Sequence, residues 1–205
     1  IGSGSGQQSI TAFAEADDSN SFWLIQAGAG KRCKRGEPVP CGSIVRLRHA
    51  NTKAYLHSHL HSSPLSRQQE VSCYDGEDTG DDWKVECPSG KYWTREEPIQ
   101  LSHMDSKTYL TSSTSHQYGQ PIPGQLEVAA AKTSSKSTHW IAQVRRVFFG
   151  LGRKPHGRNL HKSCFYFWFK NVGGHLFCRK YTVEGSKKKY KIDFSKERRM
   201  WTSCV

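Results

Sequence analysis

The sequence predicts an all-β protein and, within that class, a β-trefoil. The main observation is an internal repeat. Segment 43–58, SIVRLRHANTKAYLHS, aligns without gaps with segment 97–112, EPIQLSHMDSKTYLTS. No segment of residues 1–143 keeps the 3.6-residue apolar period of an amphipathic helix. Repeated units that cannot bury their own apolar faces fold by packing against one another, which favours a closed repeat architecture.

Each full repeat has the sequence pattern of four short strands. An alternating apolar run opens it, with Val45 and Leu47 in one copy and Ile99 and Leu101 in the other. Alternation of this kind is typical of a half-buried strand. A polar turn follows, at 51–53 and 105–107, where Asx side chains favour a chain reversal. A second strand at 54–56 or 108–110, a third near 70–71 and a fourth ending the repeat complete the unit.

A tryptophan near the end of each unit marks a threefold pattern. Trp83 and Trp140 close the two full copies, and Trp23 closes a partial copy, in which SGQQSIT at 5–11 resembles SRQQEVS at 66–72. We therefore draw a partial repeat one at 1–32, repeat two at 41–87 and repeat three at 91–143. Three four-stranded units around one axis make a β-trefoil. A β-sandwich is the alternative, but it does not require a threefold repeat.

Charge divides the 205-residue chain into two regions. Residues 1–143 hold 14 Lys and Arg against 15 Asp and Glu, whereas residues 144–205 hold 16 against 3. We expect 144–205 to be a basic aromatic tail, irregular, poorly ordered or unrelated to the rest. Its FYFWFK run and basic residues would suit nucleic acid. His161, Cys164, His175 and Cys178 would suit zinc. We expect neither, and no stretch of 18 apolar residues predicts a membrane span.

The cysteines predict one disulfide. Cys41 precedes the first strand of repeat two and Cys87 follows its last strand, and these two strands lie close together in a trefoil lobe. Their bond would close a long loop. Cys33 should lack a partner, because the start of repeat one is absent, with a Cys33–Cys41 bridge as the alternative. We expect Cys73 to be a free, partly buried thiol.

The histidines and acidic residues of repeat two are the candidate chemistry. His57, His59 and His61 alternate, which places them on one face of a strand and would suit a metal or a pH switch. We interpret them as local hydrogen-bonding groups and expect no metal site. The acidic run of residues 75–82 is interpreted as a solvated turn. No nucleophile elbow, P-loop or HExxH motif is present, so we expect no enzyme and no cofactor.

Several longer motifs resemble one known family. The segments GSGSGQQSIT, DDSNSFW, CGSIVRLRH, LHSH, SPLSRQQEV, DDWKVEC and HQYGQPIPGQLEV closely resemble the stromal cell-derived factor 2 group of MIR-domain proteins. The resemblance covers roughly residues 1–143. It implies a β-trefoil of three MIR repeats with the first one truncated. It also implies a chaperone accessory of the endoplasmic reticulum lumen, which associates with a lumenal heat-shock chaperone, its J-domain co-chaperone and misfolded clients.

The resemblance leaves one alternative function open, and the sequence does not show the targeting signals that it would imply. The family is also similar to the MIR modules of protein O-mannosyltransferases, which would favour binding of a glycan or an acceptor protein. IGSGSG at the start does not follow a signal-peptide pattern, and MWTSCV at the end matches no retrieval signal. As binding candidates we single out the exposed loops of repeat two around His57, His59, Gln69 and Glu70. A trefoil that lacks half a lobe should be marginally stable unless the tail or a partner covers the open seam.

Overall fold

The structure is a computed structural model that describes residues 5–14, 19–34, 36–150, 161–172 and 174–178. The regular structure of these residues consists of strands and three short 3-10 helices, with no α-helix. The strands are β1 (Gln8–Phe13), β2 (Trp23–Ala27), β3 (Ile44–His49), β4 (Tyr55–Ser62), β5 (Gln69–Tyr74), β6 (Trp83–Glu86), β7 (Pro98–His103), β8 (Tyr109–Gln117), β9 (Leu126–Ala131), β10 (Trp140–Gly150), β11 (His161–Asn171) and β12 (Gly174–Cys178). The 3-10 helices are η1 (Ser19–Ser21), η2 (Thr79–Asp81) and η3 (Lys136–Thr138).

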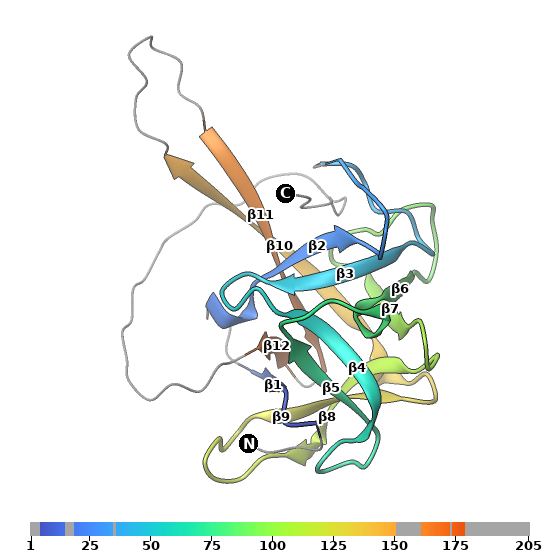
Figure 1. Cartoon of the computed structure of the whole chain (residues 1–205), viewed down its shortest axis with the longest axis vertical. Coiled ribbons are helices and arrows are strands. Elements are labelled where there is room, and N and C mark those ends of the chain that lie inside the picture. The colour runs from blue at the N-terminus through green and yellow to red at the C-terminus, as the bar shows by residue number, and fades with distance from the viewer. Residues whose placement is uncertain (1–4, 15–18, 35, 151–160, 173, 179–205) are drawn as a thin grey trace.

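Six of the strands form a closed barrel. Strand β2 pairs with β3, β3 with β6, β6 with β7, β7 with β10, β10 with β11, and β11 returns to β2, always antiparallel. A closed ring of strands leaves no unpaired edge. Strands β10 and β11 make a long hairpin that extends beyond the barrel (Figure 1). The all-β prediction is confirmed.

Three antiparallel strand pairs, two of them hairpins, complete the fold and give it threefold pseudo-symmetry. They are β4–β5, β8–β9 and β12–β1, and their inner strands β1, β5 and β9 pair with one another. Lobe two therefore consists of β3 to β6 and lobe three of β7 to β10. Lobe one consists of β11, β12, β1 and β2. This arrangement is a β-trefoil, as the repeat predicts.

The three marker tryptophans occupy equivalent positions. Trp23, Trp83 and Trp140 are each completely buried. Each indole Nε1–H donates to a backbone carbonyl of its own lobe: Leu176 at 3.2 Å, Leu56 at 2.9 Å and Leu110 at 2.8 Å. Buried tryptophans need such an acceptor for the indole N–H. The predicted threefold relation of these residues is confirmed, and it identifies β12 as the counterpart of β4 and β8.

The C-terminal region differs from the expectation of an irregular, unrelated tail. Residues 144–150, 161–172 and 174–178 continue β10 and supply β11 and β12, the first two strands of lobe one. Phe169 and Leu176 are fully buried in the core. The Asn171 amide donates to the carbonyls of Ser112 and Ser137 at 2.9 and 2.8 Å. Without these strands the barrel would be open between β10 and β2. The C-terminal region is therefore regular because its strands close the barrel between β10 and β2.

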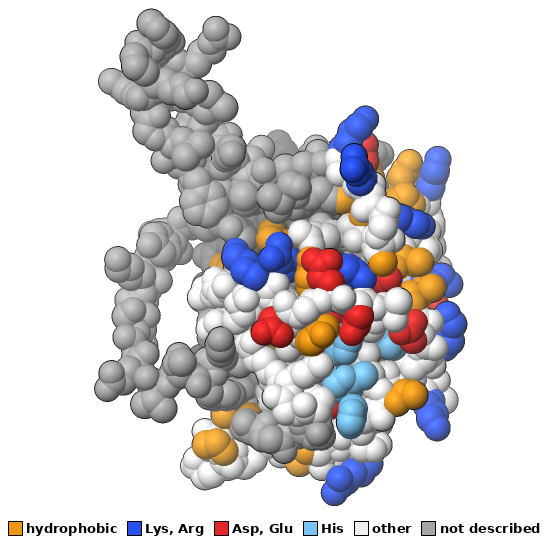
Figure 2. Space-filling view, in the orientation of Figure 1, with side chains coloured by type: hydrophobic (Ala, Val, Ile, Leu, Met, Phe, Trp, Pro, Cys, Tyr) orange, Lys and Arg blue, Asp and Glu red, His pale blue; other side chains and the backbone are white. Residues whose placement is uncertain are grey.

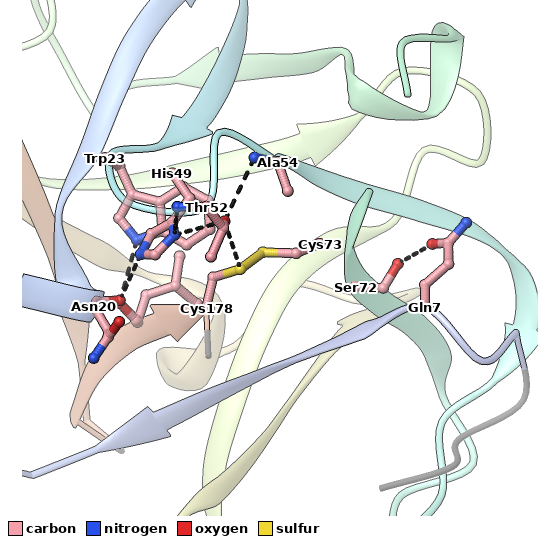
Figure 3. Close-up of a disulfide and its surroundings, with 10 residues drawn as sticks. Gln7, Asn20, Trp23, His49, Thr52, Ala54, Ser72, Cys73 and Cys178 are labelled. Carbon is pink, nitrogen blue, oxygen red and sulfur yellow. Dashed lines mark hydrogen bonds between the residues drawn. A yellow bond between two sulfur atoms is a disulfide. The ribbon is translucent and has the colours of Figure 1, made fainter. Parts of the chain in front are cut away.

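The disulfides correct two expectations about the cysteines. Cys41 is bonded to Cys87, the pairing that lobe geometry suggests. Cys73 is not a free thiol, because it is buried and bonded to Cys178 at the end of β12 (Figure 3). Cys33 is also disulfide-bonded, so the expectation that it lacks a partner is wrong. The alternative Cys33–Cys41 bridge is wrong too, because Cys41 is bonded to Cys87.

The same bond excludes the zinc site considered for the tail. Cys178 is oxidised and cannot act as a thiolate ligand. His175 on β12 pairs in register with Lys170 on β11, and His161 lies on β11 nine residues before Lys170. At the rise of a β-strand, nine residues separate the backbone of His161 from that of His175 by roughly 30 Å. The side chains of His161 and Cys164 lie outside the described part. In the described part of the chain, no helix has the length and apolar character needed to cross a membrane.

Candidate functional site

A pocket of about 450 Å³ opens where lobe two meets lobe three. Strands β4 and β5 form one side, and the η2 turn and the turn after β7 form the other. The lining residues are Gln7, His57, Ser58, His59, Leu60, Gln69, Tyr74, Asp78, Thr79, Gly80, His103, Asp105 and Ser106. Figure 2 shows histidine and acidic side chains next to one another on this face. The pocket is therefore lined mainly by residues whose side chains can hydrogen-bond.

His57 is held at the base of this pocket by a buried carboxylate. It lies on β4 and is only 4 % exposed. Its Nδ1 lies 3.0 Å from Oδ1 of Asp81, which is fully buried, and 3.4 Å from Oδ1 of Asp78. The Asp81 Oδ2 also accepts the backbone N–H of Asp78, and Asp78 accepts that of Gly80. The two carboxylates thus cap η2 and fix the histidine ring at the same time.

The next histidine on the strand contacts a different buried carboxylate. His59 Nε2 lies 2.9 Å from Glu70 Oε2, and Glu70 is 2 % exposed. The imidazole rings of His57, His59 and His61 follow one another at centroid distances of 5.0 and 4.7 Å. The three rings therefore share one face, as the alternation predicts.

The turn after β7 forms the opposite rim. His103 Nε2 donates to the carbonyl of Gly80 at 3.1 Å, and its Nδ1 lies 2.8 Å from the Ser106 hydroxyl. Thr79 donates its hydroxyl to Oδ2 of Asp105 at 2.7 Å. His49 makes the same pair of contacts in lobe two, to Asn20 and Thr52, so this histidine serves the shared lobe architecture.

Three of the four predicted binding residues line the pocket, but their setting differs from the expectation. His57, His59 and Gln69 are lining residues, whereas Glu70 lies behind His59. All four lie on β4 and β5, not in exposed loops. Glu70 also accepts the backbone N–H of Ser5.

Lobe three has a matching buried glutamate. Glu127 accepts the backbone N–H groups of Leu65 and Ser66, so a buried glutamate that holds a neighbouring loop recurs in the fold. The role of Glu70 is therefore architectural in part.

The acidic turn also differs from the solvated turn that the sequence suggests. Asp81 is fully buried, and Asp82 is 8 % exposed with its Oδ1 2.7 Å from Nε of Arg46. Sequence reasoning did not place Asp78 and Asp105 in the pocket lining or Asp81 behind it. Their contacts with β4 and with the turn after β7 span 21 to 26 residues, and no local sequence pattern reveals them.

His57, Asp78 and Asp81 could in principle hold a metal ion. One ligand atom from each lies within 4.8 Å of the others. However, the carboxylates are already used to cap η2 and to bind the imidazole, so the geometry is accounted for by hydrogen bonds.

We expect His103 to make stability depend on pH. Burial lowers its pKa below the ordinary 6.5, and the hydrogen bond to the Gly80 carbonyl opposes this in part. Between the lowered pKa and 6.5 the unfolded chain binds more protons than the folded one, so the free energy of unfolding must fall as pH drops through that window. Urea unfolding at pH 7.5, 6.5 and 5.5 should show a smaller loss for His103→Gln than for the parent. Equal losses would contradict the assignment.

Comparison with known proteins agrees with this geometry. The MIR domain family model matches residues 3–137. A stromal cell-derived factor 2-like protein of Dictyostelium discoideum is 51 % identical over 142 residues, which cover 68 % of this chain and 67 % of the relative. Stromal cell-derived factor 2 of Homo sapiens is 46 % identical over 157 residues, covering 75 % and 71 %.

A solved structure has a similar fold. The crystal structure of the SDF2-like protein from Arabidopsis thaliana superposes with a TM-score of 0.66 at 41 % identity, over 69 % of this chain and 80 % of that one. The repeats, the threefold tryptophans and these matches agree, and the chain belongs to the stromal cell-derived factor 2 family of MIR-domain proteins.

Proposed function

We propose that the protein is a non-catalytic chaperone accessory of the endoplasmic reticulum lumen. Its trefoil would bind a lumenal heat-shock chaperone together with a J-domain co-chaperone, and misfolded clients. The observation that carries this proposal is membership of the stromal cell-derived factor 2 family over most of the chain. Disulfides support the compartment, because they form and persist in the oxidising secretory pathway.

The pocket supports a binding role over a catalytic one. Its histidines are engaged in contacts that hold the surrounding turns, His57 with Asp81 and His103 with Gly80. A general base needs instead to face the proton that it removes from a substrate. Groups whose lone pairs and protons serve the fold are better suited to shape a recognition surface.

A pull-down from the secretory pathway tests the proposal. The full chain, tagged and directed to the lumen, is expected to recover a heat-shock chaperone and a J-domain co-chaperone after mild cross-linking, as read by mass spectrometry. A tagged, disulfide-bonded lumenal protein of another fold serves as the control. Recovery of neither partner by the folded chain, with circular dichroism confirming the β structure, would contradict the proposal.

A second candidate is a module that binds a glycan or an acceptor protein, as in the protein O-mannosyltransferases that the family resembles. The side chains that line the pocket favour it, because their amide, imidazole and carboxylate groups can hydrogen-bond to sugar hydroxyls. Glycan binding by the purified chain that is lost in Gln69→Ala, without recovery of chaperones, would favour this candidate over the first.

A further inference from the structure

The mouth of the pocket is acidic. Asp78 and Asp105 both line it, Asp105 is exposed, and the Asp78 side chain is 51 % exposed. The basic side chains nearby contact other carboxylates or backbone carbonyls. The Arg46 guanidinium contacts the Asp82 and Glu77 carboxylates and donates from Nη2 to the Asp78 backbone carbonyl at 2.6 Å, and the Lys107 ammonium donates to the Met104 carbonyl at 2.6 Å. Within the described residues, no Lys or Arg forms an ion pair with Asp78 or Asp105.

The equivalent junction between lobes one and two forms without the charge of Asp105. The counterpart of Asp105 is Asn51, one repeat earlier, whose amide donates to Ser19 across the equivalent junction at 3.2 Å. A neutral amide therefore connects lobes one and two where Thr79 and Asp105 connect lobes two and three.

The cap of η2 can also be compared with its counterparts in the other lobes. In lobe three, Ser135 and Thr138 replace Asp78 and Asp81, and Ser135 N–H donates to the Thr138 hydroxyl at 3.1 Å. This is the bond that Asp78 N–H makes to Asp81 at 3.0 Å. In lobe one the corresponding buried residue is Ser21. Lobe three thus builds the same turn with neutral hydroxyls, whereas lobe one keeps an aspartate, Asp18, at the sequence position that aligns with Asp78. The negative charge of Asp81 is therefore not required to form this turn.

The floor of the pocket also carries a matched pair of residues. A Cβ on Gly80 would clash with Cε1 of His57, so the histidine ring fits only because position 80 is glycine. The equivalent pair in lobe three is Thr111 and Ser137, which hydrogen-bond to each other at 2.9 Å. Lobe two thus has an aromatic ring beside the acidic mouth in place of a hydroxyl pair.

We propose that this pocket binds a Lys or Arg side chain carried by an extended segment of a partner polypeptide. The cation would lie between the Asp78 and Asp105 carboxylates, and its methylene stem would pack on Leu60, which is 89 % exposed at the rim. The His57 and Tyr74 rings, 4.8 Å apart, add an aromatic wall. This inference rests on the proposed protein-binding function and names the chemistry of the bound segment.

Paired peptides test it. The purified full chain is titrated into a fluorescent twelve-residue peptide of Ser, Ala and Leu with one central Arg, and into the same peptide with Gln at that position. Fluorescence anisotropy is read at 50 and 200 mM salt. The Arg peptide is expected to bind about five- to tenfold more tightly at low salt, and the difference should shrink at high salt because the carboxylates are partly exposed.

Variants that borrow residues from the sister lobes localise the effect. Asp105→Asn copies Asn51 and Asp78→Ser copies Ser135, so each should fold while weakening the Arg peptide by about fivefold. Asp75→Asn removes an exposed carboxylate that does not line the pocket and should leave affinity unchanged.

Equal binding of both peptides, no binding of either at 1 mM, or the same loss in all three variants would overturn the proposal. So would thermal stabilisation by zinc or calcium chloride that Asp105→Asn abolishes.

The outcome is separable from that of the pull-down. Chaperone recovery that is indifferent to Asp78→Ser and Asp105→Asn, together with equal peptide affinities, overturns the basic-segment pocket and leaves the proposed function intact. Preference for the Arg peptide without chaperone recovery supports the pocket and overturns the function.

Discussion

Replacing Phe169 with alanine is expected to lower the free energy of unfolding by about 3–5 kcal/mol. Phe169 lies on β11, is fully buried, and its ring centroid lies 5.8 Å from that of Trp93. Its removal leaves a cavity in the core that the closed barrel cannot collapse around. Since domains are commonly stable by only about 5–15 kcal/mol, this is a large share of the total. Urea unfolding followed by tryptophan fluorescence measures the change.

A matched control lies just beyond the end of the same strand. Val172 is 65 % exposed in the turn between β11 and β12, so Val172→Ala should change stability by less than about 0.5 kcal/mol. A loss below about 1 kcal/mol for Phe169→Ala would show that β11 does not pack into the core.

Truncation extends the same argument. A chain that ends at Gly150 lacks β11 and β12, so β10 and β2 each lose their pairing with β11, and Trp23 loses the Leu176 carbonyl. Two open edges and an exposed core should prevent cooperative unfolding and promote aggregation. A sharp, reversible melt of residues 1–150 would contradict this.

The repeat in the sequence predicted most of the fold because threefold packing repeats the same residues. The marker tryptophans recur since each lobe needs a large buried side chain at the same position. The turns at 51–53 and 105–107 recur for a similar reason. In both, a lysine with positive φ, Lys53 and Lys107, closes the turn and donates to a carbonyl three residues before it. Such features are local and periodic, so one sequence reveals them.

The strands of the C-terminal region could not be predicted in the same way. Their residues lack the repeat's sequence pattern, and the role of β12 follows only from pairing with β1, more than 160 residues away in the chain. The site shows a similar limit. Alternation predicted that His57 and His59 share a face, but the burial of Asp81 beneath them depends on a hydrogen bond across 24 residues. Long-range contacts of this kind become visible only once the lobes are assembled.

Removing the bond between Cys73 and Cys178 is expected to cost about 4–5 kcal/mol on the chain-entropy estimate. The two cysteines are 105 residues apart, so the bond restricts a large part of the unfolded chain. It also joins β5 of lobe two to β12 of lobe one, beside Thr52 of the turn after β3 (Figure 3). The double variant Cys73→Ala with Cys178→Ala avoids leaving a reactive thiol in the core.

The denaturant dependence separates this effect from a packing loss. A cross-link makes the unfolded chain more compact, so its removal should raise the m-value, whereas Phe169→Ala should leave the m-value unchanged. The bond between Cys41 and Cys87 spans 46 residues and should cost somewhat less, about 4 kcal/mol. If the Cys73 and Cys178 variant lost under 1 kcal/mol with the parent's m-value, β12 would not be fixed to lobe two. Lobe one would then depend on strand pairing and core packing, and the Phe169→Ala loss would measure how much that packing contributes to closing the barrel.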